Sequence, residues 1–367
     1  MTISSPSFFR RIWRVLDERL SLSGLAYAIP EHGNTLPFLL GGTAVTLFIV
    51  QALTGILLAQ FYNPFPVTEP KAQAGFFPHN PNWPLAYASI WHIVNEVPFG
   101  AFLRSLHFWT ANGIVVVLGL HLIRNYITAT YKRPRELQWM IGVLAGIIGL
   151  LFVFTGTMLK WDQEGLEALE HNVEIGEFVG ALGYWFSPEF AVSIPLTVRV
   201  YVAHIAILPL LIVPLLLTHF YLIKRFGLST PFWIRTFTAK MLPFTSHLKR
   251  LLLLGAAVFA ILAVLSLAVA APLGQPPVEG IEVTKPLWPF LWIFAIEDFL
   301  GISGIFYGSI ALFIGLMIVP LLDRSSEVHP RKRMFMMGLL IGVIILWIVL
   351  SIYGLIAPHQ VLSEHPG

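Results

Sequence analysis

The sequence contains no cysteine. That absence excludes disulfide bonds, thiolate metal sites, cysteine-ligated iron–sulfur clusters and thioether-linked haem within the chain. Charged residues are also scarce, at 12% of the 367 residues, whereas 56% are hydrophobic. A chain with this composition is too apolar to be a water-soluble globule. Any metal ion must therefore be held by histidine or carboxylate groups, and a membrane-embedded helical bundle is favoured.

Seven apolar stretches are long enough to cross a hydrocarbon core about 30 Å thick. They cover residues 35–60, 104–127, 138–159, 198–223, 250–271, 303–322 and 334–357. We expect an all-α integral membrane protein with about seven transmembrane helices. With the N-terminus in the cytoplasm, 18 of the 23 Lys and Arg residues fall on the inner side. The positive-inside rule therefore predicts a cytoplasmic N-terminus and an outer C-terminus.

Residues 8–20, near the N-terminus, alternate basic and apolar side chains and lack the apolar run of a signal peptide. This pattern predicts an amphipathic segment that lies in the membrane interface, in contact with lipid. The net charge of +3 at pH 7 is explained by basic inner loops beside anionic lipid, so no nucleic-acid partner is expected. We expect a multi-pass protein of a bacterial inner (plasma) membrane.

Four histidines stand at matching distances on two of the predicted helices. His107 and His121 are related as i and i+14, and His204 and His219 as i and i+15. At 3.6 residues per turn, each pair lies near one face of its helix, about 21 to 22 Å apart along the axis. Two such helices face to face give two layers, each able to hold one iron by bis-histidine ligation and so to favour electron transfer. A packing histidine or a proton relay is the alternative for any single one.

Basic and small residues accompany these histidines. Arg104, Arg124, Arg199 and Lys224 lie close to a histidine in the sequence, where they could bind the propionates of a haem. Ordinary snorkelling at helix ends is the alternative. Glycines of the first and third helices, namely Gly41, Gly42, Gly55, Gly142 and Gly156, would let a flat macrocycle approach the backbone. Close helix packing explains such glycines equally well.

Taken together, these residues resemble the cytochrome b subunits of Rieske/cytochrome b complexes, the quinol oxidoreductases of respiration and photosynthesis. The similarity covers nearly the whole chain. Its motifs are Leu53-Thr54-Gly55, Pro134-Arg135-Glu136-Leu137, Phe154-Thr155-Gly156, Trp161-Asp162-Gln163, Leu196-Thr197-Val198-Arg199, Lys285-Pro286 and Leu322-Asp323-Arg324. The i, i+15 step in the fourth helix is similar to the chloroplast-type branch, in which the helices fused here are divided between two chains.

The resemblance implies a dihaem cytochrome b subunit of a quinol:electron-acceptor oxidoreductase. It implies two non-covalent b-type haems in a bundle of the first four helices, the outer one held by His107 and His204 and the inner one by His121 and His219. Quinone is the implied substrate, with Lys224 at the inner site and Pro286 and Trp288 at the outer site. The domains expected are an interfacial segment 1–30, a haem-binding domain 31–230 and a three-helix domain 231–367. The implied partners are a Rieske-type or other high-potential redox subunit, a cytochrome c-type subunit and a second copy of the chain.

One departure from the family concerns the outer quinol site. The family has a Pro-Glu-Trp-Tyr motif, whereas this chain has Pro286-Leu287-Trp288-Pro289, and leucine cannot accept a proton. Other candidates for the proton acceptor are Glu297, Asp298, Glu164 and His171, although the first two could instead lie in a solvated loop or contact another subunit.

Two other functions remain open. In the first, the chain keeps its haems but serves as an electron conduit or anchor of another redox complex, without quinol oxidation at the outer face. In the second, the chain is a haem-free transporter or receptor that uses its histidines as a proton relay. The second does not explain why paired histidines recur with flanking arginines.

Overall fold

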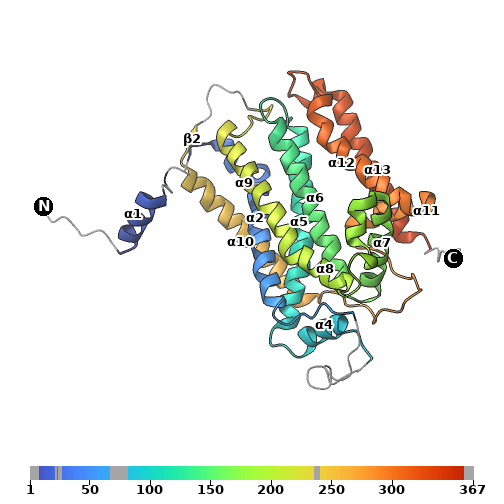
Figure 1. Cartoon of the computed structure of the whole chain (residues 1–367). Helices are drawn as coiled ribbons and strands as arrows, with labels where there is room; N and C mark the ends of the chain where they lie inside the picture. The colour runs from blue at the N-terminus through green and yellow to red at the C-terminus, as the bar shows by residue number, and fades with distance from the viewer. Residues whose placement is uncertain (1–7, 21–22, 24–26, 67–81, 235–239, 359–367) are drawn as a thin grey trace.

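The structure, a computed structural model, describes residues 8–20, 23, 27–66, 82–234 and 240–358 (Figure 1). Within this part, six helices are long and apolar enough to cross a membrane: α2 (Leu36–Leu58), α5 (Gly100–Ile127), α6 (Glu136–Met158), the continuous helix Leu196–Phe226, α10 (Phe244–Ala268) and α13 (Met334–Ile356). A seventh helix, α12 (Ile302–Leu322), lies where it was predicted, and its strongly apolar part is Ile302–Met317. The prediction of an all-α integral membrane protein is confirmed.

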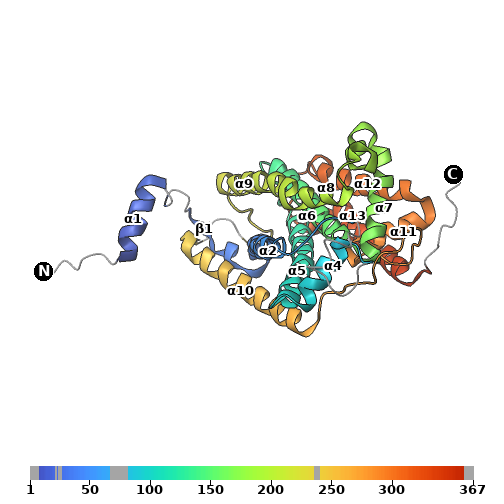
Figure 2. The same cartoon turned by 60° about the horizontal axis from the view of Figure 1, so that its bottom comes forward.

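The central helices run side by side, as Figures 1 and 2 show. Helix α2 packs along α5, and α6 packs along α9 (Leu208–Phe226), while α10 packs on α2 and α5 and α12 packs on α6. Leu47 of α2, Val117 of α5 and Leu262 of α10 belong to one buried apolar cluster. Because these helices are apolar on most faces, they suit burial among other helices and lipid.

Small residues bring α10 close to α2. A Cβ atom added at Gly255 would lie 2.8 Å from the hydroxyl oxygen of Thr46, and one added at Gly42 would lie 2.0 Å from Leu251. Larger side chains at either glycine would therefore push the two helices apart. Close helix packing thus explains Gly42, which contacts α10 rather than a histidine.

The remaining elements are short. They are α1 (Phe8–Leu20), β1 (Ile29–Pro30), η2 (Glu31–Asn34), α4 (Leu85–Asn95), α7 (Gln163–Val179), η3 (Gly180–Phe186), η4 (Pro188–Ala191), α8 (Leu196–Val202), η5 (Ala203–Ile207), β2 (Met241–Leu242), η7 (Trp288–Phe290), α11 (Leu291–Leu300) and η8 (Pro330–Lys332). Strand β1 pairs antiparallel with β2 and ties the segment before α2 to the segment before α10. Helix α1 lies apart from the bundle (Figure 1), and the two ends of the chain, residues 1–7 and 359–367, lie outside the described residues.

The outer segment 272–301 is not a loop throughout, because η7 and α11 occupy residues 288–300. Helix α11 forms from a nearly continuous apolar run, and its Ala295 is fully buried. It packs on α13 so closely that a Cβ atom at Gly354 would lie 2.4 Å from the carbonyl oxygen of Leu291. A loop position for Glu297 and Asp298 is therefore wrong, since both residues are helical.

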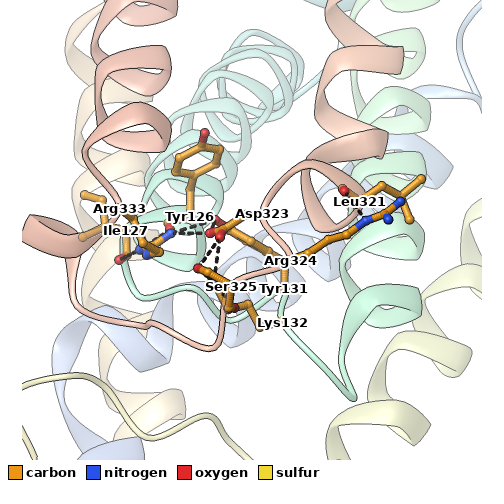
Figure 3. Close-up of polar contacts among 9 residues, drawn as sticks. All are labelled: Tyr126, Ile127, Tyr131, Lys132, Leu321, Asp323, Arg324, Ser325 and Arg333. Atoms are coloured by element: carbon orange, nitrogen blue, oxygen red, sulfur yellow. Dashed lines mark hydrogen bonds and ion pairs between the residues drawn. The ribbon is translucent and has the colours of Figure 1, made fainter.

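Polar side chains at the other end of the bundle join the α5–α6 turn to the α12–α13 turn (Figure 3). This end, expected to face the cytoplasm, is called the inner side below. Asp323 accepts hydrogen bonds from the Tyr131 hydroxyl and from Nζ of Lys132, both at 2.7 Å. Nη1 of Arg333 lies 3.2 Å from the Asp323 carboxylate, and Nη2 donates to the carbonyl of Ile127. These groups fix the relative position of the two turns.

One turn of the fourth membrane helix is wider than an α-helical turn. Residues Ala203–Ile207 form a π-helical turn, in which the N–H of Leu208 donates to the carbonyl of Ala203. Such a turn absorbs one extra residue in a helix. It accounts for the longer step from His204 to His219 than from His107 to His121 in α5.

Candidate site for two haem groups

The outer pair of histidines is held in a symmetric way. Nδ1 of His107 lies 2.8 Å from the hydroxyl of Thr54, and Nδ1 of His204 lies 2.8 Å from the hydroxyl of Thr155. Each threonine comes from a neighbouring helix and directly precedes one of the glycines singled out in the sequence. A hydrogen bond at Nδ1 fixes the orientation of an imidazole and leaves Nε2 for a metal. The outer histidines therefore fit an axial-ligand role.

The inner pair is held by other partners. Nδ1 of His219 lies 3.1 Å from the carbonyl of Gln138, the same kind of contact as in the outer pair. Nε2 of His121 lies 3.0 Å from the amide nitrogen of Asn125, and its Nδ1 is buried without a hydrogen-bond partner among the described residues. A buried imidazole nitrogen without a partner is costly unless it binds a further group.

The two histidines of each expected layer are near enough to affect each other's charge, His107 with His204 and His121 with His219. Their pairing as ligands of one iron stays a prediction. Thr54 and Thr155 were not singled out from the sequence. The signal that could have found them is that each stands before a glycine in the motifs Leu53-Thr54-Gly55 and Phe154-Thr155-Gly156.

Each of the four remaining glycines of the set faces one histidine. In the inner layer, a Cβ atom added at Gly41 would lie 2.9 Å from Cε1 of His121, and one at Gly142 would lie 3.2 Å from Cε1 of His219. In the outer layer, a Cβ atom at Gly55 would lie 3.3 Å from Cε1 of His107, and one at Gly156 would lie 3.4 Å from Cε1 of His204. Each glycine thus lets one imidazole ring lie against the backbone of the adjacent helix. The glycines therefore fit a site in which the two histidines of each layer lie against neighbouring helices and leave the space between them for a bound group.

We expect Gly41→Val to displace the His121 ring and to weaken inner haem binding. Overpacking of a close contact costs about 1–3 kcal/mol, and the Cβ distance of 2.9 Å leaves no room for a branched side chain. Haem content and redox difference spectra of the purified protein measure the effect. The matched control is Gly342→Val, because a Cβ atom at this exposed glycine of α13 meets nothing within 4 Å. An equal loss in both variants would contradict the prediction.

The predicted arginines bind backbone carbonyls in this structure. Arg104 donates to the carbonyls of Ala271 and Pro272 at 2.8 and 2.5 Å. Nε of Arg124 donates to the carbonyl of Pro37 at 3.1 Å, and Arg199 donates to two carbonyls of the η3–η4 region. These three side chains stabilise the ends of the bundle, and Arg124 also lines the central cavity described next.

A large cavity of about 2090 Å³ runs through the bundle. It exceeds the range of about 300–1,000 Å³ typical of a pocket for one small ligand. Its lining includes Gly41, His121, Gly142, His219 and Lys224, and further residues toward the outer side. The cavity therefore has room for more than one large apolar group, in contact with the inner histidines.

The outer end of this cavity contains the altered motif and several acids. Pro286, Leu287 and Trp288 line it together with Glu164, His171 and Glu297, whereas Asp298 is not among the lining residues. The indole N–H of Trp288 donates to Asn112 at 2.7 Å. Two oxygens of Glu297 lie 3.0 and 3.2 Å from Nε2 of His171. The structure thus brings together Glu297 and His171 but not Asp298.

Comparison with known proteins gives a consistent result. A family described as "Cytochrome b(N-terminal)/b6/petB" matches residues 112–276. The chain is 35% identical to cytochrome b6 of Mastigocladus laminosus over 223 residues, which are 58% of this chain and 95% of that protein. It is 34% identical to cytochrome b6 of Heliobacterium mobile, over 56% of this chain and 90% of that protein. A solved structure titled "Hyperthermophilic respiratory Complex III" shares the fold with a TM-score of 0.74 and 22% identity, covering 95% of this chain and 90% of that chain.

Proposed function

Since this chain belongs to the cytochrome b family of bc- and b6f-type complexes, we propose that it carries electrons across the membrane between two quinone sites through two b-type haems. The observation that supports this most strongly is the repeated arrangement of Thr, Gly and His in the outer layer, with Thr54 and Gly55 at His107 and Thr155 and Gly156 at His204. When bound, a haem supplies reversible one-electron reduction and oxidation at iron.

The four histidines would hold the two haems at different depths. His107 and His204 would bind the outer one, and His121 and His219 the inner one. Thr54, Thr155 and the carbonyl of Gln138 orient three of the four imidazoles, those of His107, His204 and His219. The surrounding apolar helices exclude water and keep each site at a distinct potential.

The inner end of the cavity would hold one quinone. Tyr27, Ser229, His247 and Lys224 line it with apolar residues of α9 and α10, which is the composition expected for an amphipathic ring. Nδ1 of His247 lies 3.0 Å from Oδ1 of Asn34, so the imidazole is already oriented. His247 was not predicted from the sequence, because its partner Asn34 is 213 residues away along the chain.

The experiment that tests this function is anaerobic reduction of the purified complex by a hydroquinone, followed by reoxidation with quinone. We expect about two haems per chain by pyridine haemochrome and quinol-dependent reduction of both. Lys224→Ala should slow exchange through the inner site about 10-fold or more, because a charge-assisted hydrogen bond is lost. The control is Arg225→Ala, since Arg225 does not line the cavity. One haem or none, or equal rates in wild type and Lys224→Ala, would contradict the assignment.

The assembly follows from the same proposal. We expect a multi-pass subunit of a bacterial plasma membrane, with a high-potential redox subunit and a cytochrome c-type subunit on the outer side and a second copy of this chain. The division into 31–230 and 231–367 separates the haem-binding helices from α10, α12 and α13. The haem-bearing conduit without outer quinol oxidation remains the second candidate, because Leu287 stands in the altered motif.

A further inference from the structure

The outer end of the cavity, beside Leu287, contains a histidine between two carboxylates. Nε2 of His171 lies 3.0 Å from Oε1 of Glu297 and 3.6 Å from Oε1 of Glu282. Nδ1 of the same ring lies 2.8 Å from the backbone carbonyl of Glu167, which fixes the imidazole. His171, Glu282 and Glu297 all line the cavity that Leu287 lines. Three elements, α7, the segment before η7, and α11, therefore converge on one polar cluster.

The exposed fraction of these three side chains increases from Glu297 through His171 to Glu282. Glu297 is 12% exposed, His171 is 18% exposed and Glu282 is 29% exposed. The cluster thus begins at a nearly buried carboxylate and ends at one that reaches the outer water. Nε2 of His171 lies between these two carboxylates, within hydrogen-bond distance of Glu297 and 3.6 Å from Glu282.

Other acids near this cluster have structural partners. Both oxygens of Glu167 accept hydrogen bonds from the segment before η7, including the backbone N–H groups of Val283 and Thr284 at 2.9 and 3.0 Å. Asp162 accepts from the backbone at the start of α7 and before η7. Glu164 lines the cavity but pairs with Lys160. Glu297 is consequently the more buried of the two cavity carboxylates that lie beside His171, a side chain that can carry a proton.

We propose that Glu297 accepts a proton from a hydroquinone bound beside Leu287, and that His171 passes it through Glu282 to the outer water. This inference rests on the proposed function. An O–H bond of the hydroquinone breaks and its proton forms an O–H bond on Glu297. Nε2–H of His171 gives its proton to Glu282, and Nε2 then takes the proton from Glu297. Glu282 releases its proton to the outer water, and a second passage through the same relay removes the second O–H proton of the hydroquinone. The two electrons would reach two one-electron acceptors, namely the outer haem and a high-potential centre of a partner subunit.

The electrostatics suit a charged relay. Burial lowers the pKa of His171, but the hydrogen bond to Glu297 and the charges of Glu297 and Glu282 outweigh it and raise the pKa to about 9. The ring is therefore an imidazolium at neutral pH. Glu297 of α11 and Glu282 act on the ring, and Glu170 of its own helix interacts with it. The other charged residues of these elements are Glu164, Glu167, Glu174 and Glu177 of α7, Lys160 before α7, and Asp298 of α11.

The test uses quinol-dependent reduction of the outer haem in the whole complex, with the inner site blocked. Glu297→Gln should slow this step about 10²- to 10⁴-fold, which is the usual contribution of a general base. It should also remove a carboxyl C=O band from the quinol-induced infrared difference spectrum. His171→Asn should slow the same step, because it removes the ring that lies between Glu297 and Glu282. Glu177→Gln, at an exposed position of the same helix, is the matched control.

A second variant separates a lost proton acceptor from a damaged fold. Leu287→Glu in the Glu297→Gln background places a carboxylate at the position of the family motif and should restore much of the rate. Unchanged rates in Glu297→Gln, or a loss confined to Glu164→Gln or Asp298→Asn, would overturn the assignment of Glu297. If wild type itself shows no quinol-dependent reduction while both haems are present, the proposed function fails instead.

Discussion

Replacing His204 by alanine is expected to lower the haem content from about two to about one per chain, with loss of the outer haem. A bis-histidine site loses half of its protein ligands in this variant, and alanine offers no atom that can bind iron. The inner pair, His121 and His219, lies at the other end of the same helices and should keep its haem. Pyridine haemochrome and low-temperature difference spectra measure both effects.

Two further variants make this result specific. Thr155→Val removes the hydrogen bond at Nδ1 of His204 but keeps both ligands, so we expect weaker binding, about 10- to 100-fold, and a shifted potential rather than an empty site. His92→Ala changes a histidine of α4 whose ring contacts Glu96 outside the bundle, and should retain both haems. Two haems in His204→Ala, or equal losses in His92→Ala, would show that the histidine pairs are not the ligands.

Asp323→Asn should strongly destabilise the inner end of the bundle. The side chain of Arg333 is 1% exposed and that of Asp323 is 4% exposed, so the substitution leaves a guanidinium buried without its carboxylate (Figure 3). Removing one member of a buried ion pair costs about 3–5 kcal/mol. Thermal unfolding of the detergent-solubilised protein, followed by haem absorbance, measures the change. Glu327→Gln is the control, because the pair of Glu327 with Lys332 is exposed and worth about 0–1 kcal/mol.

The difference between wild type and Asp323→Asn should depend on pH. Burial raises the pKa of Asp323, but hydrogen bonds from Lys132, Tyr131 and Ser325 outweigh it and hold the pKa below the ordinary 3.8. A carboxyl group with a lowered pKa stabilises the fold above its unfolded value and loses this effect as the pH falls through the folded value. The two proteins should therefore converge below about pH 3.8. A constant difference down to lower pH would contradict this origin.

The sequence predicted those features that depend on local pattern. Hydropathy located the membrane helices. The i, i+14 and i, i+15 steps singled out the four histidines, whose pairing as ligands stays a prediction. The π-turn at Ala203–Ile207 was not predicted, although the longer second step and the nearby Pro209, which has no N–H to donate, were signals of it. The hydrophobic pattern also could not show that η7 and α11 form within residues 272–301.

Features that join distant parts of the chain were not available from the sequence. Nothing local relates His171 to Glu297, or Arg333 to Tyr131, because each pair is separated by several helices. The sequence offered several acidic residues as proton acceptors for the outer site. Glu297 differs from Asp298 in that it lines the cavity, which only the structure shows. Helix propensity and hydrophobic periodicity predict the helix to which a residue belongs and the face on which it lies. Contacts between distant helices depend on how the helices pack, which these patterns do not give.

The close contact between α2 and α10 shows that the two parts of the chain can be held together without the peptide link between them. Gly42, Thr46 and Gly255 let the two helices meet closely, β1 pairs with β2, and Arg333 binds the α5–α6 turn. All three contacts join residues before Phe226 to residues after it and are made through space. A break in the reading frame between α9 and α10 would therefore leave two polypeptides that still recognise each other within the bilayer, so one open reading frame or two can specify the same bundle.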